Sequence, residues 1–422
     1  MTVRYLLGDT REVVASLPDA SVDLVLTSPP FLALRSYLPA DDPNKHLEIG
    51  SDPHPAAFID TMLGLTAEWR RVLAPHGSIA VEFGDTYSGS GGAGGDYNEK
   101  GLRADQPKFS GSALSYRKEA VRNRDLCGWP LAKSLALIPE LYRVGLAYGI
   151  NALTGQPSPA GRWRVRNVVR WVRPNPPVGA LGDKFRPATS DLVIACTAGD
   201  RWFDLDAVRQ PMAESTAERG TGNRRLAGTK SKQSASGHHG RDFDVATGSN
   251  PAGAPPLDWW EIVPGGYSGS HYAVYPPELC VRPIEAMCPR RVCRTCGKPS
   301  RRETSEPEYV NNAGRPAQFD MSRPRLADGV RQFATNGDNS AHKVTTTTGW
   351  SSCGCPGTDG IRLDGFHTGT GWRPGVVLDP FGGSGTTGLV AHGHSRDAIL
   401  VDLDPRNVDL ARERLGMFLD VA

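Results

Sequence analysis

The stretch 376–405, VVLDPFGGSGTTGLVAHGHSRDAILVDLDP, decides the fold. It opens with a short apolar run that ends at Asp379, passes through a glycine-rich turn, and enters a helical pattern near Thr386. A second apolar run ends at Asp402. Two apolar runs joined by a helix predict a β-α-β unit with parallel strands.

The turn of this unit contains Gly382, Gly383 and Gly385. Glycines at such a turn allow the backbone to approach a ligand closely, and an acid after the second strand can bind a ribose. The spacing differs from the G-x-G-x-x-G pattern of dinucleotide-binding proteins, which disfavours NAD. A purely structural turn is the alternative interpretation.

Other apolar runs alternate with helical patterns along the chain. Strands are expected in VRYLL, VDLVL, HGSIAVEFGD, RNVVRWV and DLVIACT, and helices in TREVVASLP, FIDTMLGLTAEWRRVLAP and LAKSLALIPELYRVGLAYG. Residues 86–125 are rich in Gly and Ser and predict a mobile surface loop. The fold class is therefore α/β, a Rossmann-like doubly wound sheet that is mostly parallel and covered on both faces.

The composition is that of an ordinary globular protein, with 39% hydrophobic and 22% charged residues in 422. The sequence contains no apolar run of about 18 residues and no signal peptide pattern at its start, so no membrane span and a cytoplasmic location are expected. A net charge of +2 is too small to establish a nucleic-acid partner. Two basic stretches, 162–173 and 282–303, can contact phosphates, although a solvated surface explains them equally well.

The second informative stretch is TSPPF, residues 27–31. It ends an apolar strand with a small hydroxyl, two prolines and an aromatic ring. Pro29 and Pro30 restrict φ and make the turn rigid, so that the Ser28 hydroxyl and the Pro29 carbonyl are held as fixed acceptors. The ring of Phe31 offers a face for stacking. The alternative is a purely structural role, in which the two prolines end the strand and Phe31 packs in the core.

Taken together, TSPPF, DPFGGSGTT and VDLDP resemble the amino-methyltransferases of DNA, which use S-adenosylmethionine. The catalytic motif precedes the cofactor motif, as in the circularly permuted beta group. Further segments agree in order: RVLAPHGSIAVEFGD, RNVVRWVRPNPPV, RWFDLDAVRQP and HYAVYPPEL. One departure is Thr189-Ser190, where family members often carry His-Glu.

The resemblance implies a role for each matched position. Ser28, Pro29, Pro30 and Phe31 would be the catalytic residues. The cofactor would be framed by Asp379, Phe381, Gly383, Gly385 and Thr386, with Asp402 accepting from its ribose and His271 and Pro276 near its carboxylate. Asp9 would lie at the adenine end or form a structural turn. Arg173, Asn175 and Pro176 would line the target-base pocket or simply end a strand.

The chemistry that this family performs explains the TSPPF turn. An exocyclic amine of a base is a weak nucleophile because its lone pair is drawn into the ring, and acceptors for its N–H groups let the nitrogen pyramidalise. A base swung out of the duplex can stack on Phe31. Ser rather than Asp before Pro-Pro is the form usual in enzymes acting on cytosine N4, with adenine N6 as the alternative. Methylation of ring carbon needs a cysteine nucleophile, which the motif lacks.

Five of the eight cysteines lie between residues 288 and 355. Cys293 and Cys296 form a CxxCG knuckle of the kind that binds zinc, and Cys353 and Cys355 form a shorter second one, with Cys288 as a possible substitute. The segment between them is polar, and a metal would compensate for its lack of a core. Structural zinc is expected, with reduced free cysteines or disulfides as alternatives.

These observations predict a division of the chain. Residues 1–209 form the catalytic part, 210–265 a target-recognition region, 266–287 and 371–422 the cofactor-binding part, and 288–356 a zinc-ribbon-like insertion. The expected function is methylation of cytosine N4 in double-stranded DNA of a prokaryote or phage, with a cognate restriction enzyme as a possible partner. The alternatives are an RNA or small-molecule methyltransferase, and a zinc-bearing DNA-binding protein with an inactive cofactor site. The recognition sequence and the oligomeric state are not encoded in any motif.

Overall fold

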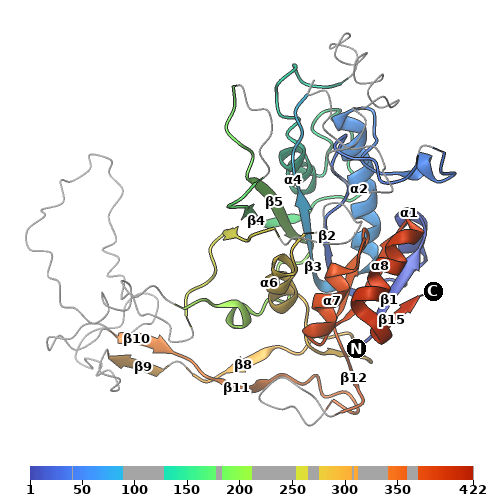
Figure 1. Cartoon of the computed structure of the whole chain (residues 1–422). Helices are drawn as coiled ribbons and strands as arrows, with labels where there is room; N and C mark the ends of the chain where they lie inside the picture. Colours follow the sequence, from blue (N-terminus) through green and yellow to red (C-terminus); the bar gives the residue numbers. More distant parts are fainter. Residues whose placement is uncertain are drawn as a thin grey trace, which may run out of the picture.

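The computed structural model describes residues 1–39, 41–88, 128–176, 183–211, 253–264, 275–306, 308–311, 341–358 and 369–421. Its body is a nine-stranded sheet with the strand order β15-β1-β14-β13-β2-β3-β5-β4-β6 (Figure 1). Strands β15 (Leu419–Val421), β1 (Val3–Leu7), β14 (Asp397–Asp402), β13 (Val376–Asp379), β2 (Val22–Thr27) and β3 (Leu73–Phe83) are parallel to one another.

The other end of the sheet departs from the parallel pattern. β5 (Thr189–Cys196) runs antiparallel to both β3 and β4 (Arg164–Val172), and β6 (Trp259–Glu261) is parallel to β4. The sheet is therefore mostly parallel, as the sequence predicts. The C-terminal strands β13 and β14 lie between the N-terminal strands β1 and β2, so the late glycine-rich unit occupies the middle of the sheet.

Helices cover both faces of the sheet and form two cores. One face carries α1 (Thr10–Ser16), α2 (Pro55–Val72) and α4 (Ile138–Tyr148), and the other carries α6 (Pro277–Met287), α7 (Thr386–Gly393) and α8 (Pro405–Leu415) (Figure 1). In β2, Val25 packs in the first core while Leu24 and Leu26 pack in the second. Alternate side chains of a strand point to opposite faces, which is why every residue of β2 is buried.

One predicted helix is shorter than its sequence pattern. The segment 131–149 becomes helical only at Ile138, because Leu137 adopts a left-handed conformation with φ 61° and Pro139 stands in the first turn. Proline favours the start of a helix, since it has no N–H to donate. No helix in the described ranges is both long and apolar enough to cross a membrane.

The Cys-rich segment forms small ribbons beside the sheet. β7 (Val292–Cys293) pairs with β12 (Trp372–Arg373), β8 (Arg302–Thr304) with β11 (Thr347–Trp350), and β9 (Glu308–Asn311) with β10 (Ala341–Val344), all antiparallel. Figure 1 shows β8 and β11 running along one side of the sheet toward β9 and β10. The 3-10 helices Lys45–Leu47, Leu205–Val208 and Gly416–Phe418 complete the described elements.

Candidate active site

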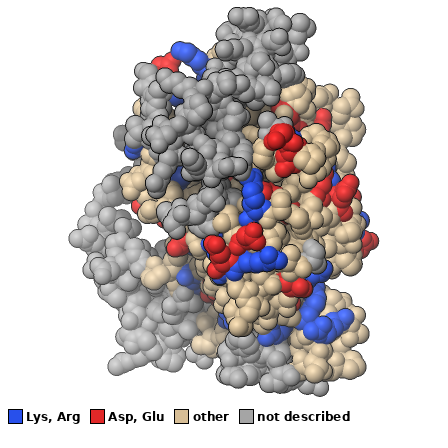
Figure 2. All heavy atoms as spheres, turned by 45° about the vertical axis from the view of Figure 1, so that its right-hand side comes forward, with Lys and Arg blue, Asp and Glu red and all other residues tan. Residues whose placement is uncertain are grey.

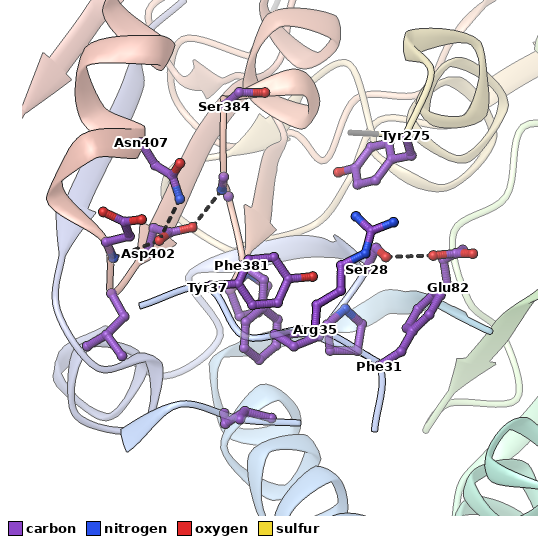
Figure 3. A pocket seen from close by; sticks show the side chains of 18 of the residues that line it. Ser28, Phe31, Arg35, Tyr37, Glu82, Tyr275, Phe381, Ser384, Asp402 and Asn407 are labelled. Atoms are coloured by element: carbon purple, nitrogen blue, oxygen red, sulfur yellow. Dashed lines mark hydrogen bonds between the residues drawn. The ribbon is translucent and has the colours of Figure 1, made fainter. Parts of the chain in front are cut away.

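A cavity of about 460 Å³ lies where the parallel strands end. It is lined by residues 28–31, which follow β2, and by residues 380–384, which follow β13 (Figure 3). Open α/β sheets bind ligands beyond the carboxyl ends of their strands. The structure thus confirms that two motifs about 350 residues apart in sequence share one cavity.

The hydroxyl of Ser28 points toward a buried carboxylate. Ser28 Oγ donates a hydrogen bond of 2.5 Å to Glu82 Oε2 (Figure 3). The pairing of Thr27 with Val81 in the β2–β3 register brings the next residues, Ser28 and Glu82, side by side. Because Ser28 uses its proton on Glu82, the lone pairs of Oγ are free to accept from a ligand in the cavity.

Glu82 lies in an environment that disfavours its charge. Burial raises the pKa of Glu82 above its usual range, while the hydroxyls of Ser190 and Ser28 and the charge of Arg173 oppose that rise. Its second oxygen, Oε1, is buried and has no hydrogen-bond partner. A buried carboxylate oxygen with no partner beside a cavity is suited to accept a proton or a hydrogen bond from a bound molecule.

Aromatic and cationic groups form the wall on the same side. The ring of Phe31 lies against Gly84, where an added Cβ would come within 2.5 Å of Phe31 Cε2. Trp171 also lines the cavity, and the guanidinium of Arg173 lies 5.0 Å from its ring centroid. Arg35 contributes from the loop after β2 (Figure 3). This part of the cavity can receive a flat ring that carries polar edges.

The opposite wall is built around Asp402. Its Oδ2 accepts from the backbone N–H of Gly383 at 2.8 Å, and its Oδ1 accepts from Asn407 Nδ2 at 3.0 Å and from the N–H of Asp404 at 2.8 Å (Figure 3). Burial raises the pKa of Asp402 to about 6. A carboxylate offers about four lone-pair positions, so Asp402 can still accept from hydroxyl groups of a ligand.

Asp379 lies behind the cavity wall and connects the TSPPF motif to the glycine-rich turn through hydrogen bonds. It is fully buried and accepts from Thr27 Oγ1 at 2.6 Å, Tyr275 OH at 2.9 Å and Phe381 N at 3.1 Å. Burial raises its pKa, and the Thr27, Thr387 and Tyr275 hydroxyls oppose the rise. The Thr27 bond joins the end of β2 directly to the start of the glycine-rich turn.

The cavity contains polar atoms that the protein itself leaves without partners. Among the described residues, Thr10 Oγ1, Arg35 Nη1 and Glu82 Oε1 are buried, lack a hydrogen bond and belong to lining residues. A buried unpaired polar group costs about 1–3 kcal/mol. Together with the acceptors of Asp402 and the backbone of Gly382 and Gly383, which lines the cavity, these atoms fit a large polar ligand with hydroxyl, amine and aromatic parts, as S-adenosylmethionine has.

The remaining predicted residues fall into three groups. Pro29, Pro30, Asp9, Phe381 and Thr386 line the cavity; Asp9 also caps α1 by accepting from the N–H of Arg11. Gly385, with φ +81°, is the N-cap of α7, and Pro276 is the N-cap of α6; neither lines the cavity. His271, most of the region 210–265 and nearly all of the loop 86–125 lie outside the described residues.

Arg173 lines the cavity, whereas Asn175 and Pro176 do not. Other arginines of the stretch 162–173 have intramolecular partners: Arg170 Nε lies 3.2 Å from Asp191 Oδ1, and Arg164 donates to the carbonyl of Thr197. Figure 2 shows acidic and basic side chains interspersed on the described part of one face. The described part of this face therefore carries no surface of a single charge sign.

No role was predicted from the sequence for several lining residues, above all Glu82, Arg35, Tyr37, Tyr275 and Asn407. Glu82 had one detectable signal: it is the only charged residue in the otherwise apolar run SIAVEF. A charge inside a buried strand needs a partner or a function. Tyr275 stands inside the segment HYAVYPPEL, but only the structure shows that its hydroxyl contacts Asp379.

The fold and the cavity define an α/β protein with a ligand cavity at the carboxyl edge of a mostly parallel sheet. A family model described as DNA methylase (N6_N4_Mtase) matches residues 22–291 and 373–413. The chain therefore belongs to this DNA methylase family. It is an S-adenosylmethionine-dependent DNA methyltransferase, and its substrate is DNA.

Curated relatives agree with this family. The chain is 22% identical to the Type II methyltransferase M.SmaI of Serratia marcescens over 98% of its own length and 90% of the relative's. It is 28% identical to the Type II methyltransferase M.SfiI of Streptomyces fimbriatus, over 50% of this chain and 40% of that protein.

Among solved structures, the PvuII DNA methyltransferase, titled cytosine-N4-specific, aligns with a TM-score of 0.41 at 15% identity, covering 98% of this chain and 86% of that chain. A putative DNA modification methylase of Thermus thermophilus, complexed with S-adenosyl-L-methionine, aligns with a TM-score of 0.40 at 19% identity, covering 99% and 97%. The family assignment rests on the family match rather than on these scores.

Proposed function

We propose that this protein methylates the exocyclic N4 amine of cytosine in duplex DNA, by flipping the base and transferring the methyl group directly. The observation that carries the proposal is the Ser28–Glu82 pair, which faces the glycine-rich turn and Asp402 across one cavity. Serine before Pro-Pro supports cytosine rather than adenine. Ser28, Pro29, Pro30 and Phe31 then form the target-base side, and Asp402 with the turn forms the cofactor side.

When bound, S-adenosylmethionine supplies a methyl group on a positively charged sulfur. Ser28 Oγ and the Pro29 carbonyl accept hydrogen bonds from the two N–H groups of the target amine, which turns the nitrogen lone pair out of the ring plane. The prolines hold these acceptors rigidly, and rigid positioning of reacting groups lowers the barrier by several kcal/mol. Phe31, held on Gly84, stacks against the flipped base.

As its nitrogen bonded to the methyl carbon, with the sulfur keeping the electron pair of the broken bond, the amine would have to lose one proton. Ser28 Oγ takes that proton while its own proton passes to Glu82 Oε2, along the hydrogen bond of 2.5 Å. Burial raises the pKa of Glu82, so its carboxylate is a stronger proton acceptor than a solvated one. No covalent intermediate with the base is required.

On the cofactor side, Asp402 would accept hydrogen bonds from the ribose hydroxyls, and Asp9 and Asn407, which also line the cavity, would hold the adenosine. The backbone from Phe381 to Ser384, which lines the cavity, would hold the amino-acid part. Asp379 holds the turn against β2, and Gly385 begins α7. Pro276 begins α6, whose first turn follows Tyr275; His271 belongs to the same segment and is proposed to lie near the cofactor's carboxylate.

The order of β1, β14, β13 and β2 in the sheet supports a circularly permuted arrangement of the beta group. We assign target recognition to residues 210–265, which is a proposal from sequence position. Because the curated relatives are Type II methyltransferases, a cognate restriction endonuclease is the proposed partner. We place the enzyme in the cytoplasm of a bacterium or a phage-infected cell.

One experiment tests the proposal. The full-length protein is incubated with tritiated S-adenosylmethionine and duplex DNA, RNA or nucleosides, and the modified base is identified by mass spectrometry. N4-methylcytosine in duplex DNA is the expected product. Label only in N6-methyladenine would overturn the cytosine assignment, and label only in RNA or nucleosides would overturn the DNA substrate. DNA binding without label would favour an inactive cofactor site.

Ser28→Ala tests the role of the turn. The variant loses an acceptor but no part of the cofactor side, so we expect nearly unchanged cofactor affinity and a strongly reduced turnover. Isothermal titration with S-adenosylmethionine measures the first quantity, and single-turnover methylation measures the second. Lost cofactor affinity with an unchanged rate would contradict the role given to Ser28.

A further inference from the structure

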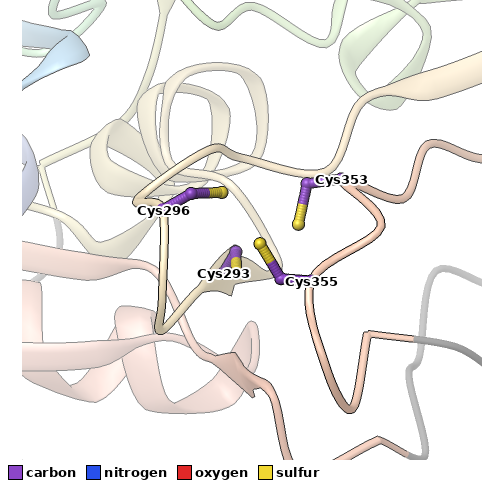
Figure 4. A group of neighbouring side chains, drawn as sticks. All are labelled: Cys293, Cys296, Cys353 and Cys355. Atoms are coloured by element: carbon purple, nitrogen blue, oxygen red, sulfur yellow. The ribbon is translucent and has the colours of Figure 1, made fainter.

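The methyl-transfer site makes no use of a cluster of four cysteines outside the cavity. Cys293, Cys296, Cys353 and Cys355 come from two segments some 60 residues apart in sequence, and their sulfurs all lie within 4.8 Å of one another (Figure 4). None of the four lines the cavity. A tetrahedral zinc ion with Zn–S bonds of about 2.3 Å holds its sulfurs roughly 3.8 Å apart, so the cluster needs only a small contraction.

The first knuckle has the backbone geometry of a thiolate site. The N–H of Thr295 points at Cys293 Sγ at 3.4 Å, and Gly297 takes the left-handed conformation, with φ +69°, that closes the turn. The Thr295 N–H is therefore a hydrogen-bond donor to this sulfur. Such donors stabilise a sulfur that carries negative charge.

The second knuckle is short, with one residue between its cysteines. Gly354 adopts φ +73°, and a Cβ there would meet nothing within 4 Å. The left-handed turn lets Cys353 and Cys355 direct both sulfurs to the same point (Figure 4). Thr358 holds the turn by donating to the carbonyl of Cys355 at 2.5 Å.

From these observations we propose that Cys293, Cys296, Cys353 and Cys355 bind one structural Zn²⁺, and that this ion fastens the Cys-rich insertion to the methyltransferase sheet. Four thiolates leave no open coordination position, so the ion takes no part in catalysis. The described ribbon β8–β11 has only two strands, and a two-stranded ribbon is marginally stable without further support.

A short series of contacts connects the cysteine cluster to the central sheet. Cys293 pairs with Trp372 in the β7–β12 ladder, and the N–H of Arg294 donates to the carbonyl of Gly371 at 2.8 Å. The residue after Trp372, Arg373, donates from Nη1 to Asp23 Oδ2 at 2.6 Å, at the start of β2.

Asp23 is fully buried and also accepts from the N–H of Val376, at the start of β13. The cysteine cluster is thus one ladder pair away from the contact at Asp23 that joins β2 to β13. β2 leads to Ser28, and β13 leads to the glycine-rich turn of the cofactor side. The ion stabilises the junction between the two halves of the active site from the edge opposite the cavity.

The test of the site uses the full-length protein purified without added metal. Elemental analysis is expected to find about one zinc per chain, and titration of the thiols with a mercurial reagent should release it to a chromogenic chelator. Replacement by Co²⁺ should give the intense visible absorption of a tetrahedral tetrathiolate site. Metal-free native protein, or iron in place of zinc, would overturn the assignment.

Variants separate ligand loss from general damage. Cys296 is exposed, so Cys296→Ser removes a ligand without disturbing the core, and bound zinc should fall at least about tenfold. Cys196→Ser is the matched control: its Sγ donates to the carbonyl of Ala198 at 3.3 Å, at the end of β5 and outside the cluster, and a serine hydroxyl can replace it. Equal zinc content in the two variants would overturn the proposal.

Hydrogen exchange tests the fastening. Removal of zinc should speed the exchange of amides in β12 and β13 by at least about tenfold while leaving β4 and β5 unchanged. No change at β12 and β13 would show that the ion supports the insertion alone, and equally faster exchange throughout the sheet would show a general loss of stability. Either result would overturn the proposed link between the ion and the sheet. Because this readout needs no methylation activity, its failure is independent of the proposed function.

Discussion

Replacing Glu82 by glutamine tests the proton route most directly. The substitution keeps the volume of the side chain and keeps an oxygen that can accept from Ser28, but an amide does not take up a proton. The hydrogen bond of 2.5 Å between Ser28 and Glu82 loses its ionic character. Charge-assisted hydrogen bonds contribute about 1.5–3 kcal/mol, and general bases accelerate reactions by about 10²–10⁴-fold.

From these two contributions we expect kcat to fall by roughly 10²–10³-fold in Glu82→Gln, with little change in the dissociation constants for S-adenosylmethionine and DNA. Rapid-quench single-turnover methylation of a duplex measures the chemical step. The pH profile adds a second readout. Since the pKa of Glu82 is raised by burial, wild-type activity should decline with falling pH at a higher pH than a solvated glutamate would produce, and the variant should lose this limb.

The matched control is Glu285→Gln in α6, whose carboxylate contacts His394 Nδ1 at 3.1 Å and does not line the cavity. That variant should retain wild-type kcat. Thermal unfolding of both variants identifies any general loss of structure. A Glu82→Gln enzyme with a normal chemical step, in a folded protein, would refute the proton route while leaving the DNA methyltransferase assignment untouched.

Three further predictions rest on single contacts. Burial raises the pKa of Asp402 to about 6. Below that pH the acceptor becomes protonated, so the affinity for S-adenosylmethionine should weaken by up to about tenfold per pH unit. In calorimetric titrations, Asp402→Asn should abolish this pH dependence. Gly84→Ala places a Cβ 2.5 Å from Phe31, so duplex methylation should fall more than cofactor affinity, measured side by side. Arg373→Met leaves the Asp23 carboxylate without its guanidinium partner, so the free energy of unfolding, measured by denaturant titration, should fall by about 3 kcal/mol. Arg412→Met, on the exposed face of α8, is the control. A smaller loss in Arg373→Met than in this control would contradict the importance of the Arg373–Asp23 ion pair.

The stability contributed by Asp23 has a defined sign with pH. Burial raises its pKa, but hydrogen bonds and charges from His76 and Arg373 outweigh burial, so the pKa is lowered overall. A carboxylate whose pKa is lower in the folded than in the unfolded state stabilises the protein above its unfolded pKa. This contribution is lost as the pH falls through the lowered value, so acid should loosen the junction of β2 and β13.

The sequence alone was sufficient for the elements whose signal is local. The run 376–405 predicts strand, glycine turn, helix and strand, and the structure contains β13, α7 and β14 in that order. Strands buried on both faces leave continuous apolar runs, and a turn that needs positive φ favours glycine. The class of enzyme followed from two such motifs, because each is short and contiguous.

Tertiary structure decided which residues meet. Glu82 becomes a partner of Ser28 only because β2 and β3 are neighbours in a register that places the two side by side. Tyr275 becomes a support of Asp379 only because the start of α6 lies beside β13, and Arg373 reaches Asp23 across about 350 residues of chain. Local propensity carries no information on strand order or on which buried polar groups satisfy one another. Those contacts are fixed by the packing of the whole sheet, and they hold the two halves of the cavity together.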